Sequence, residues 1–302
     1  MTRFDCNGIS ADSFASSGQL EAAADFFIRE GYVVLDHVLP LDAVEALLRA
    51  HGTFVYLFLY VPILIVIVYS FNDSRLVTVW AGFSTRWWQA LFANEQILSA
   101  AWLSLRVAVV SATLASLLGL AAGYVLARVP RFPGHTLFGS LVIAPMVMPE
   151  VVMGISLLLL FVGADRLFGG PERGFLTIAI AHTTFALSFV AIVVQARLAD
   201  FDRSLEEAAM DLGATPWVTF LTVTLPLIAP AVAAGWLLAF TLSLDDLIMT
   251  QFVAGGQSQT LPMLVYSSVR LGVSPQINVL ATIIVAIAAT ALLISNRLAK
   301  RR

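Results

Sequence analysis

The sequence is poor in charge. Only 12% of its 302 residues are Asp, Glu, Lys or Arg, while 59% are hydrophobic. A soluble domain carries about 25% charged residues, so this chain cannot cover a globular surface with charge. The composition therefore excludes an ordinary soluble domain and indicates a membrane protein.

Metal-binding and nucleotide-binding patterns are also missing. The single cysteine, Cys6, excludes an intramolecular disulfide and a cysteine-rich metal site. The four histidines lie far apart, without a metal-ligand spacing such as HExxH: His37, His51, His135 and His182. No Walker A sequence (GxxxxGK(S/T)) is present, so the chain is not expected to hydrolyse ATP itself. We expect no metal, no cofactor and no nucleic-acid partner.

The first 50 residues differ from the rest of the chain. Residues 1–50 carry a net charge of −5 and residues 51–302 carry +2, with the change in composition near His51. We interpret residues 1–50 as an N-terminal extension and residues 51–302 as one transmembrane domain. Residues 1–18 are polar and small, and we expect them to be disordered.

Residues 19–50 look like a piece of a soluble protein. Their pattern predicts three elements, a helix over 20–29, a strand over 32–35 and a helix over 41–48. The segment resembles the beginning of phytanoyl-CoA dioxygenase-like oxygenases, which bind iron through a His-x-Asp pair and a distant histidine. Here Asp36 and His37 are adjacent and in the opposite order, so we predict no catalysis. The alternative of a membrane-tethered oxygenase lacks its metal ligands.

Six apolar runs follow, each long enough to cross ~30 Å of hydrocarbon, which takes about 20 helical residues. They lie at 53–71, 99–127, 136–163, 174–196, 219–247 and 277–296. Eight basic residues follow the second, fourth and sixth runs, and five lie in the other loops. This asymmetry predicts that both termini are cytoplasmic. The predicted fold class is an all-α membrane protein with six transmembrane helices.

The most polar stretch between two long apolar runs is residues 204–226. Ser204 and Glu207 have the spacing of a helix capping box, which predicts the start of a short helix. Gly213 suits the left-handed position that ends such a helix. Thr215–Pro216 then predicts an N-cap followed by proline in the first turn of a second helix. The stretch is therefore predicted to form a helix–turn–helix elbow at the membrane surface.

The elbow also resembles the EAA signature of binding-protein-dependent ABC importer permeases. The matching residues are Glu207, Ala208, Ala209, Gly213, Leu225 and Pro226. Val223 stands where that family usually has isoleucine. In the family, this elbow is the cytoplasmic coupling helix that docks on the ATPase subunit, so the resemblance implies that these six residues couple to ATPase motion.

The resemblance extends over residues 53–302. Segments such as GWLLAFTLSLDDL and LPMLVYSSVRLGVSPQIN are similar to the polyamine branch of the family, above all to permeases of putrescine importers. This resemblance implies the type I importer fold in a bacterial inner membrane, as one multi-pass subunit of an ATP-driven importer. It implies three kinds of partner besides the lipid bilayer: a second homologous permease, two ABC ATPase subunits and a periplasmic polyamine-binding protein.

An ion-coupled secondary carrier for an organic cation is the alternative, because six spans and buried carboxylates alone allow it. The elbow argues against a carrier, which has no ATPase to dock.

Three acidic residues are the candidate substrate pathway, because a diammonium ion needs carboxylates where it loses water. They are Asp245, Asp246 and Glu150. The two aspartates could instead be solvated interface residues, and Glu150 could form a structural pair with Arg106. We interpret His182 as a hydrogen-bonded packing residue.

Overall fold

The computed structural model describes residues 3–5, 34–36, 41–76, 79–129, 132–170, 172–271 and 274–299. The chain divides into two compact units, Met1–Val68 and Tyr69–Arg302. In the described residues, five helices are long and apolar enough to cross a membrane, and four of them belong to the second unit.

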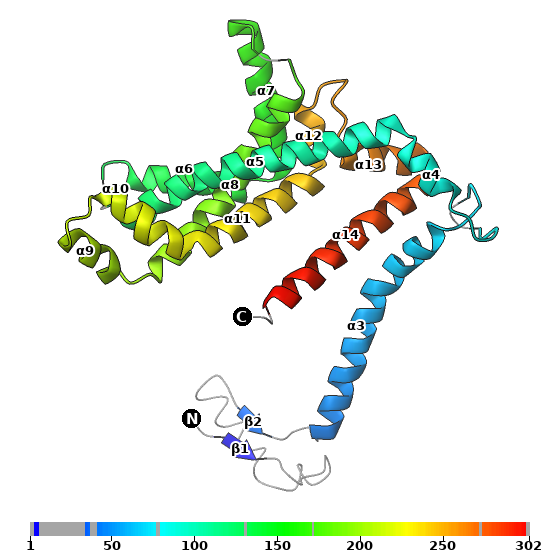
Figure 1. Ribbon diagram of the computed structural model, residues 1–302, viewed down its shortest axis with the longest axis horizontal. Helices are drawn as coiled ribbons and strands as arrows, with labels where there is room; N and C mark the ends of the chain where they lie inside the picture. The colour runs from blue at the N-terminus through cyan, green and yellow to red at the C-terminus, as the bar shows by residue number, and fades with distance from the viewer. Residues whose placement is uncertain are drawn as a thin grey trace. The chain divides into compact units, whose positions relative to one another are not determined.

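The first unit contains two short strands. β1 (Arg3–Asp5) pairs in parallel with β2 (Val34–Asp36) (Figure 1). β2 overlaps the predicted strand over 32–35, which fits its β-branched composition. β1 was not predicted, because we expected residues 1–18 to be disordered. The predicted helix over 20–29 lies outside the described residues.

One long helix, α3 (Leu41–Tyr69), makes up most of the described part of the first unit. The sequence predicts a helix over 41–48 and a separate span over 53–71, but α3 continues without a break through His51. Its apolar part, Glu45–Tyr69, is long enough to cross a membrane. The division into residues 1–50 and 51–302 therefore stays a prediction from composition.

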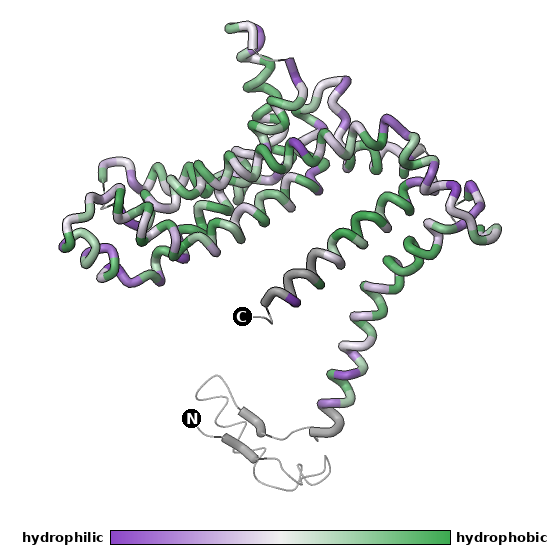
Figure 2. Tube along the Cα trace, viewed as in Figure 1, coloured by the Kyte–Doolittle hydropathy of each residue, from purple (hydrophilic) through white to green (hydrophobic). Residues whose placement is uncertain are grey.

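The second unit is helical. Its first half consists of α4 (Arg86–Phe92), α5 (Glu95–Arg128), α6 (His135–Val147), α7 (Glu150–Phe168) and α8 (Phe175–Ala199). Its second half consists of α9 (Ser204–Asp211), α10 (Pro216–Thr219), the π-helix η1 (Phe220–Thr224), α11 (Leu225–Asp245), α12 (Ile248–Val253), α13 (Leu261–Leu271) and α14 (Pro275–Ala299). The predicted all-α fold class is confirmed. Figure 2 shows hydrophobic residues along the long helices and hydrophilic residues mainly at the turns.

The predicted third span, 136–163, is wrong as a single helix. α6 ends at Val147, Met148 is extended with a ψ of 138°, and α7 begins again at Glu150. Pro149 explains the break, because a proline has no N–H to donate and disfavours helical backbone at the residue before it. Glu150 consequently lies in the first turn of a new helix, at an exposed position.

α5, α8 and α11 pack closely side by side (Figure 1). Small residues make this possible: a Cβ added to Gly119 would lie 2.7 Å from Cβ of Val190, and one added to Gly123 would lie 2.6 Å from the Ala191 carbonyl oxygen. Without a hydrophobic driving force between helices in lipid, such close backbone approach is what holds spans together. α5 and α8 therefore have little room to slide past each other.

A second packed region joins α7 and α12 to α5 and α8. Its buried residues are Val107, Met153, Leu157, Phe161, Ile178, Ala181, Met249 and Val253. Gly154 of α7 lies so close to α12 that an added Cβ would be 2.6 Å from the ring of Phe252. This contact fixes the start of α7 beside the end of α11, where the candidate acidic residues lie.

Candidate functional site

The elbow begins with α9, and its start differs from the prediction. The residue before the helix is Arg203, so Ser204 is already helical and its side chain forms no capping bond. Asp202 replaces it, because its carboxylate accepts a hydrogen bond of 2.9 Å from the Ser204 backbone N–H. This hydrogen bond lowers the pKa of Asp202. The predicted capping box of Ser204 and Glu207 is therefore wrong, although the helix is present.

The turn of the elbow matches the prediction. Gly213 has a φ of +91°, in the left-handed region that favours glycine. Its N–H donates to the Met210 carbonyl at 2.9 Å, which closes the end of α9. The Thr215 side chain then accepts from the Val218 N–H at 3.4 Å, and Pro216 opens α10. Two short helices thus meet at a glycine.

Most of α9 is exposed, including several apolar side chains. α9 contains no buried residue, and the side chains of Leu205, Met210 and Leu212 are 48%, 42% and 89% exposed. Glu207 and Ala208 are exposed as well, whereas Ala209 is half-buried. We call Leu205, Glu207, Ala208, Met210 and Leu212 the elbow surface. Leu225 and Pro226 lie apart from it, at the start of α11.

The neighbouring acidic residue, Glu206, faces the bundle. Its side chain is only 12% exposed, and its Oε2 lies 3.0 Å from Nε of Arg128, itself 8% exposed. Its Oε1 accepts a hydrogen bond of 2.7 Å from Oγ1 of Thr224. The EAA signature singles out Glu207 and not Glu206, and two adjacent glutamates look alike in the sequence until their partners are known.

Asp246 is held in a buried polar network. Its side chain is 8% exposed, and its Oδ2 lies 3.1 Å from Nε2 of His182. The same oxygen accepts from the N–H and the hydroxyl of Thr250, at 2.8 and 2.5 Å. The other ring nitrogen of His182, Nδ1, lies 2.6 Å from Oγ of Ser243. For Asp246 the solvated-interface alternative is therefore wrong, while His182 is hydrogen-bonded and buried, as predicted.

The other two acidic residues are open. Asp245 ends α11 and Glu150 begins α7, and both are exposed. Gly154 of α7 packs on α12, which begins two residues after Asp246, so the start of α7 lies beside the aspartates. The fold therefore gathers the three predicted acidic residues, and it leaves Asp245 and Glu150 free to meet a cation.

Arg106 is not the partner of Glu150. The described residues show no ion pair between the two side chains, and the guanidinium carbon of Arg106 lies 4.9 Å from the centroid of the Phe175 ring. This distance is typical of a cation–π contact. The structural pair that was the alternative for Glu150 is therefore not formed.

Comparison with known proteins decides the family. Residues 115–302 match the family described as "Binding-protein-dependent transport system inner membrane component". The chain belongs to this family. The predicted resemblance to importer permeases and the prediction of a transport subunit without enzyme activity of its own are confirmed.

Several curated relatives of this permease are similar over most of their length. The putrescine transport system permease protein PotI of Escherichia coli (strain K12) is 55% identical over 230 residues, which are 76% of this chain and 82% of PotI. The spermidine/putrescine transport system permease protein PotC of the same strain is 43% identical over 248 residues, 82% of this chain and 92% of PotC.

Solved structures confirm the fold of the permease. A chain of a bacterial ABC transporter involved in the import of alginate aligns with a TM-score of 0.65 at 17% identity, over 87% of this chain and 98% of that chain. The methionine ABC transporter MetNI aligns with a TM-score of 0.55 at 18% identity, over 68% and 95%.

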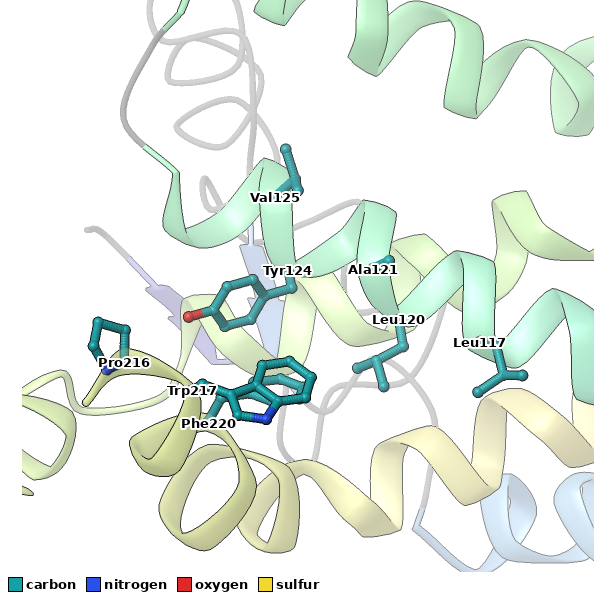
Figure 3. A pocket seen from close by; sticks show the side chains of 8 residues that line it. All are labelled: Leu117, Leu120, Ala121, Tyr124, Val125, Pro216, Trp217 and Phe220. Carbon is teal, nitrogen blue, oxygen red and sulfur yellow. The ribbon is translucent and has the colours of Figure 1, made fainter. Parts of the chain in front are cut away.

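An apolar cleft lies beside the elbow of the permease. It has a volume of about 540 Å³ and is lined by Leu117, Leu120, Ala121, Tyr124, Val125, Pro216, Trp217 and Phe220. Figure 3 shows the rings of Tyr124, Trp217 and Phe220 on its walls, from α5, α10 and η1. The Trp217 and Phe220 rings stack with centroids 5.7 Å apart, and Tyr124 contacts Phe220 edge-on at 5.1 Å. The cleft leaves space between the elbow and α5.

Proposed function

We propose that this permease is the membrane subunit of an ATP-driven importer for polyamines, with putrescine as the first substrate to test. The observation that carries the proposal is the 55% identity to PotI, a putrescine transport permease, over 82% of its length. PotC, a spermidine/putrescine permease, supports the same substrate class. Identity at this level supports a shared substrate class in addition to a shared fold.

The acidic cluster supports a dication as substrate. Each ammonium group of a diamine is costly to dehydrate, so it needs a carboxylate when it leaves water. Asp245 and Glu150 are exposed at the ends of two helices, and neither forms an ion pair with another residue of the described part of the chain. We propose that they receive the ammonium groups, while Asp246 holds the joint between α11 and α12 through His182 and Thr250.

The elbow surface supports docking on an ATPase. It presents exposed leucine and methionine side chains beside Glu207, a combination that binds an apolar groove with a basic rim. We propose that two ATPase subunits, a second homologous permease and a periplasmic polyamine-binding protein complete the importer. In this proposal the elbow and both termini lie on the cytoplasmic side of the inner membrane.

Co-purification and stimulated ATP hydrolysis test the proposed function. The permease should purify with ATPase and binding-protein partners encoded beside it, and loaded binding protein should stimulate ATP hydrolysis in proteoliposomes. Putrescine, spermidine and sulfate are compared as ligands, because a sulfate permease, CysT of Escherichia coli, is also 30% identical. Stimulation by sulfate and not by either polyamine would contradict the proposal.

The N-terminal extension should be dispensable. Deleting residues 2–50 and restoring a short basic lead should keep or improve membrane insertion and putrescine uptake, because no complete set of iron ligands accompanies the oxygenase-like segment. Membrane level by immunoblot and uptake of labelled putrescine check this. Iron-dependent turnover of 2-oxoglutarate by the intact chain would overturn it.

A further inference from the structure

Glu206 links three elements with one carboxylate. It lies on α9, and its two oxygens contact Arg128 at the end of α5 and Thr224 in η1. Both partners are buried, with the Thr224 residue 1% exposed. A charged contact in such surroundings is screened by water much less than a surface ion pair. We call Glu206, Arg128 and Thr224 the clasp.

Polar bonds, and not apolar packing, hold α9 to the bundle. α9 contributes no buried residue. Besides the clasp, Nη2 of Arg203 donates to the Ala127 carbonyl at 3.1 Å, which again lies at the end of α5. Arg128 is the last residue of α5, where a cation also favours the negative end of the helix dipole. These polar contacts tie α9 to the end of α5 and to η1, so we infer that a movement of α9 acts on both elements.

The clasp contacts α5 through Arg128 and the start of α11 through Thr224, and α11 ends at Asp245 in the acidic cluster of Asp245, Asp246 and Glu150. α5 runs for 34 residues, and an added Cβ at Gly119 or Gly123 would clash with α8, so we infer that α5 and α8 move together as one rigid unit. Thr224 is the last residue of η1, and α11 continues from it directly to Asp245. A π-helical segment inside a longer helix is frequently a functional site. The apolar cleft beside Phe220 gives η1 room to move against α5 (Figure 3).

We propose that Glu206 is a positioning residue for transport, and that it passes movement of the elbow to α5 through Arg128 and to α11 through Thr224. The inference rests on the proposed function, because it takes the elbow surface as the place where the ATPase docks. The proposal assigns different roles to two adjacent acidic residues. Glu207 faces the ATPase and contributes to docking, whereas Glu206 faces inward and contributes to coupling.

Variants of the clasp should separate coupling from docking. Glu206→Gln keeps the side-chain shape but leaves the buried Arg128 cation without its counter-charge. We expect normal ATPase association and a clear fall in the amount of substrate moved per ATP hydrolysed. Thr224→Val keeps the ion pair between Glu206 and Arg128, so the fold should be unchanged. This variant should lower the amount of substrate moved per ATP less than Glu206→Gln does. Glu207→Gln is the matched control, which should weaken ATPase association instead.

A charge swap adds a rescue. Glu206→Arg combined with Arg128→Glu restores opposite charges at the same place. The double variant should therefore move more substrate per ATP than either single variant. A wild-type amount of substrate moved per ATP in both Glu206→Gln and Thr224→Val would overturn the proposal. Uptake that falls only in step with membrane level would also overturn it, because the clasp would then be structural.

A second measurement needs no substrate. In a Cys6→Ser background, a cysteine placed at Ala121 on the wall of the cleft reports movement of α5 through its labelling rate. ATP should change this rate in the assembled complex, and Glu206→Gln should abolish the change. If no polyamine stimulates ATP hydrolysis by the wild-type complex, the proposed substrate is wrong. The labelling rate still tests whether Glu206 passes movement to α5. An ATP-dependent change that persists in Glu206→Gln would overturn it.

Discussion

Replacing Gly213 by valine should reduce putrescine uptake to background while the subunit stays in the membrane. Gly213 has a φ of +91° and open space around its Cα, so the added side chain meets no neighbour. The cost is backbone strain of ~1–2 kcal/mol, and more for a β-branched side chain. The turn relieves this strain by changing its angle, which redirects α9 relative to α10 and spoils the elbow surface.

A second glycine supplies the control. Gly134, before α6, has nearly the same φ of +92° and equally open surroundings. Gly134→Val therefore introduces the same strain outside residues 204–226 of the elbow, and it should leave ATPase association intact. Membrane level, co-purified ATPase and uptake are measured for both variants. Normal transport by Gly213→Val with the ATPase still bound would refute the coupling role of the elbow.

Reversing one charge on the elbow surface should have the same result. Glu207 is exposed on α9 beside apolar side chains, so Glu207→Lys places a cation where the proposed ATPase groove has a basic rim. Like charges across an interface cost several kcal/mol and suppress binding. ATPase association should be lost together with uptake, while membrane level stays normal. Unchanged association would mean that Glu207 lies outside the contact.

The elbow could be predicted from the sequence because its signals are local. A glycine with a positive φ, followed by Thr215 and Pro216, needs no distant partner to form the turn. The predicted capping box of Ser204 and Glu207 was wrong because of another local signal. Asp202 competes for the Ser204 N–H two residues earlier, and it starts the helix one position sooner than Ser204 would as a cap.

Long-range partners could not be predicted. Which of Glu206 and Glu207 turns inward depends on where the end of α5 lies, and Arg128 is far away in the chain. The same holds for Asp246, whose partner His182 comes from another helix. Neighbouring helical residues point about 100° apart, so the sequence does predict that two adjacent acids differ in surroundings. It does not tell which of them is buried.

The predicted third span, 136–163, is helical over most of its length but is divided into α6 and α7. Pro145 and Pro149 both lie within the predicted span 136–163, yet only Pro149 breaks the helix, while Pro145 stays inside α6. The break separates α6, which packs on α8, from α7, which packs on α12. Packing at Gly154 against Phe252 decides where α7 lies, and no local signal near Pro149 contains this information.

The two aspartates should respond differently to the same change. Asp245→Asn removes an exposed charge from the acidic cluster, so membrane level should stay normal and the substrate concentration for half-maximal uptake should rise about tenfold, equivalent to ~1.4 kcal/mol. Asp246→Asn replaces the buried carboxylate that accepts from Thr250 and lies beside His182, and leaving such buried polar groups unsatisfied costs about 1–3 kcal/mol. Its main effect should be a lower level of folded subunit.

Uptake measured against substrate concentration, normalised to membrane level, separates the two outcomes. Asp165→Asn is the control, because it removes an exposed aspartate near the other end of α7, outside the cluster. Wild-type uptake from both single variants and from the double variant would remove the aspartates from the pathway. Glu150 would then be the remaining carboxylate, and Glu150→Gln should by itself abolish the response to low substrate.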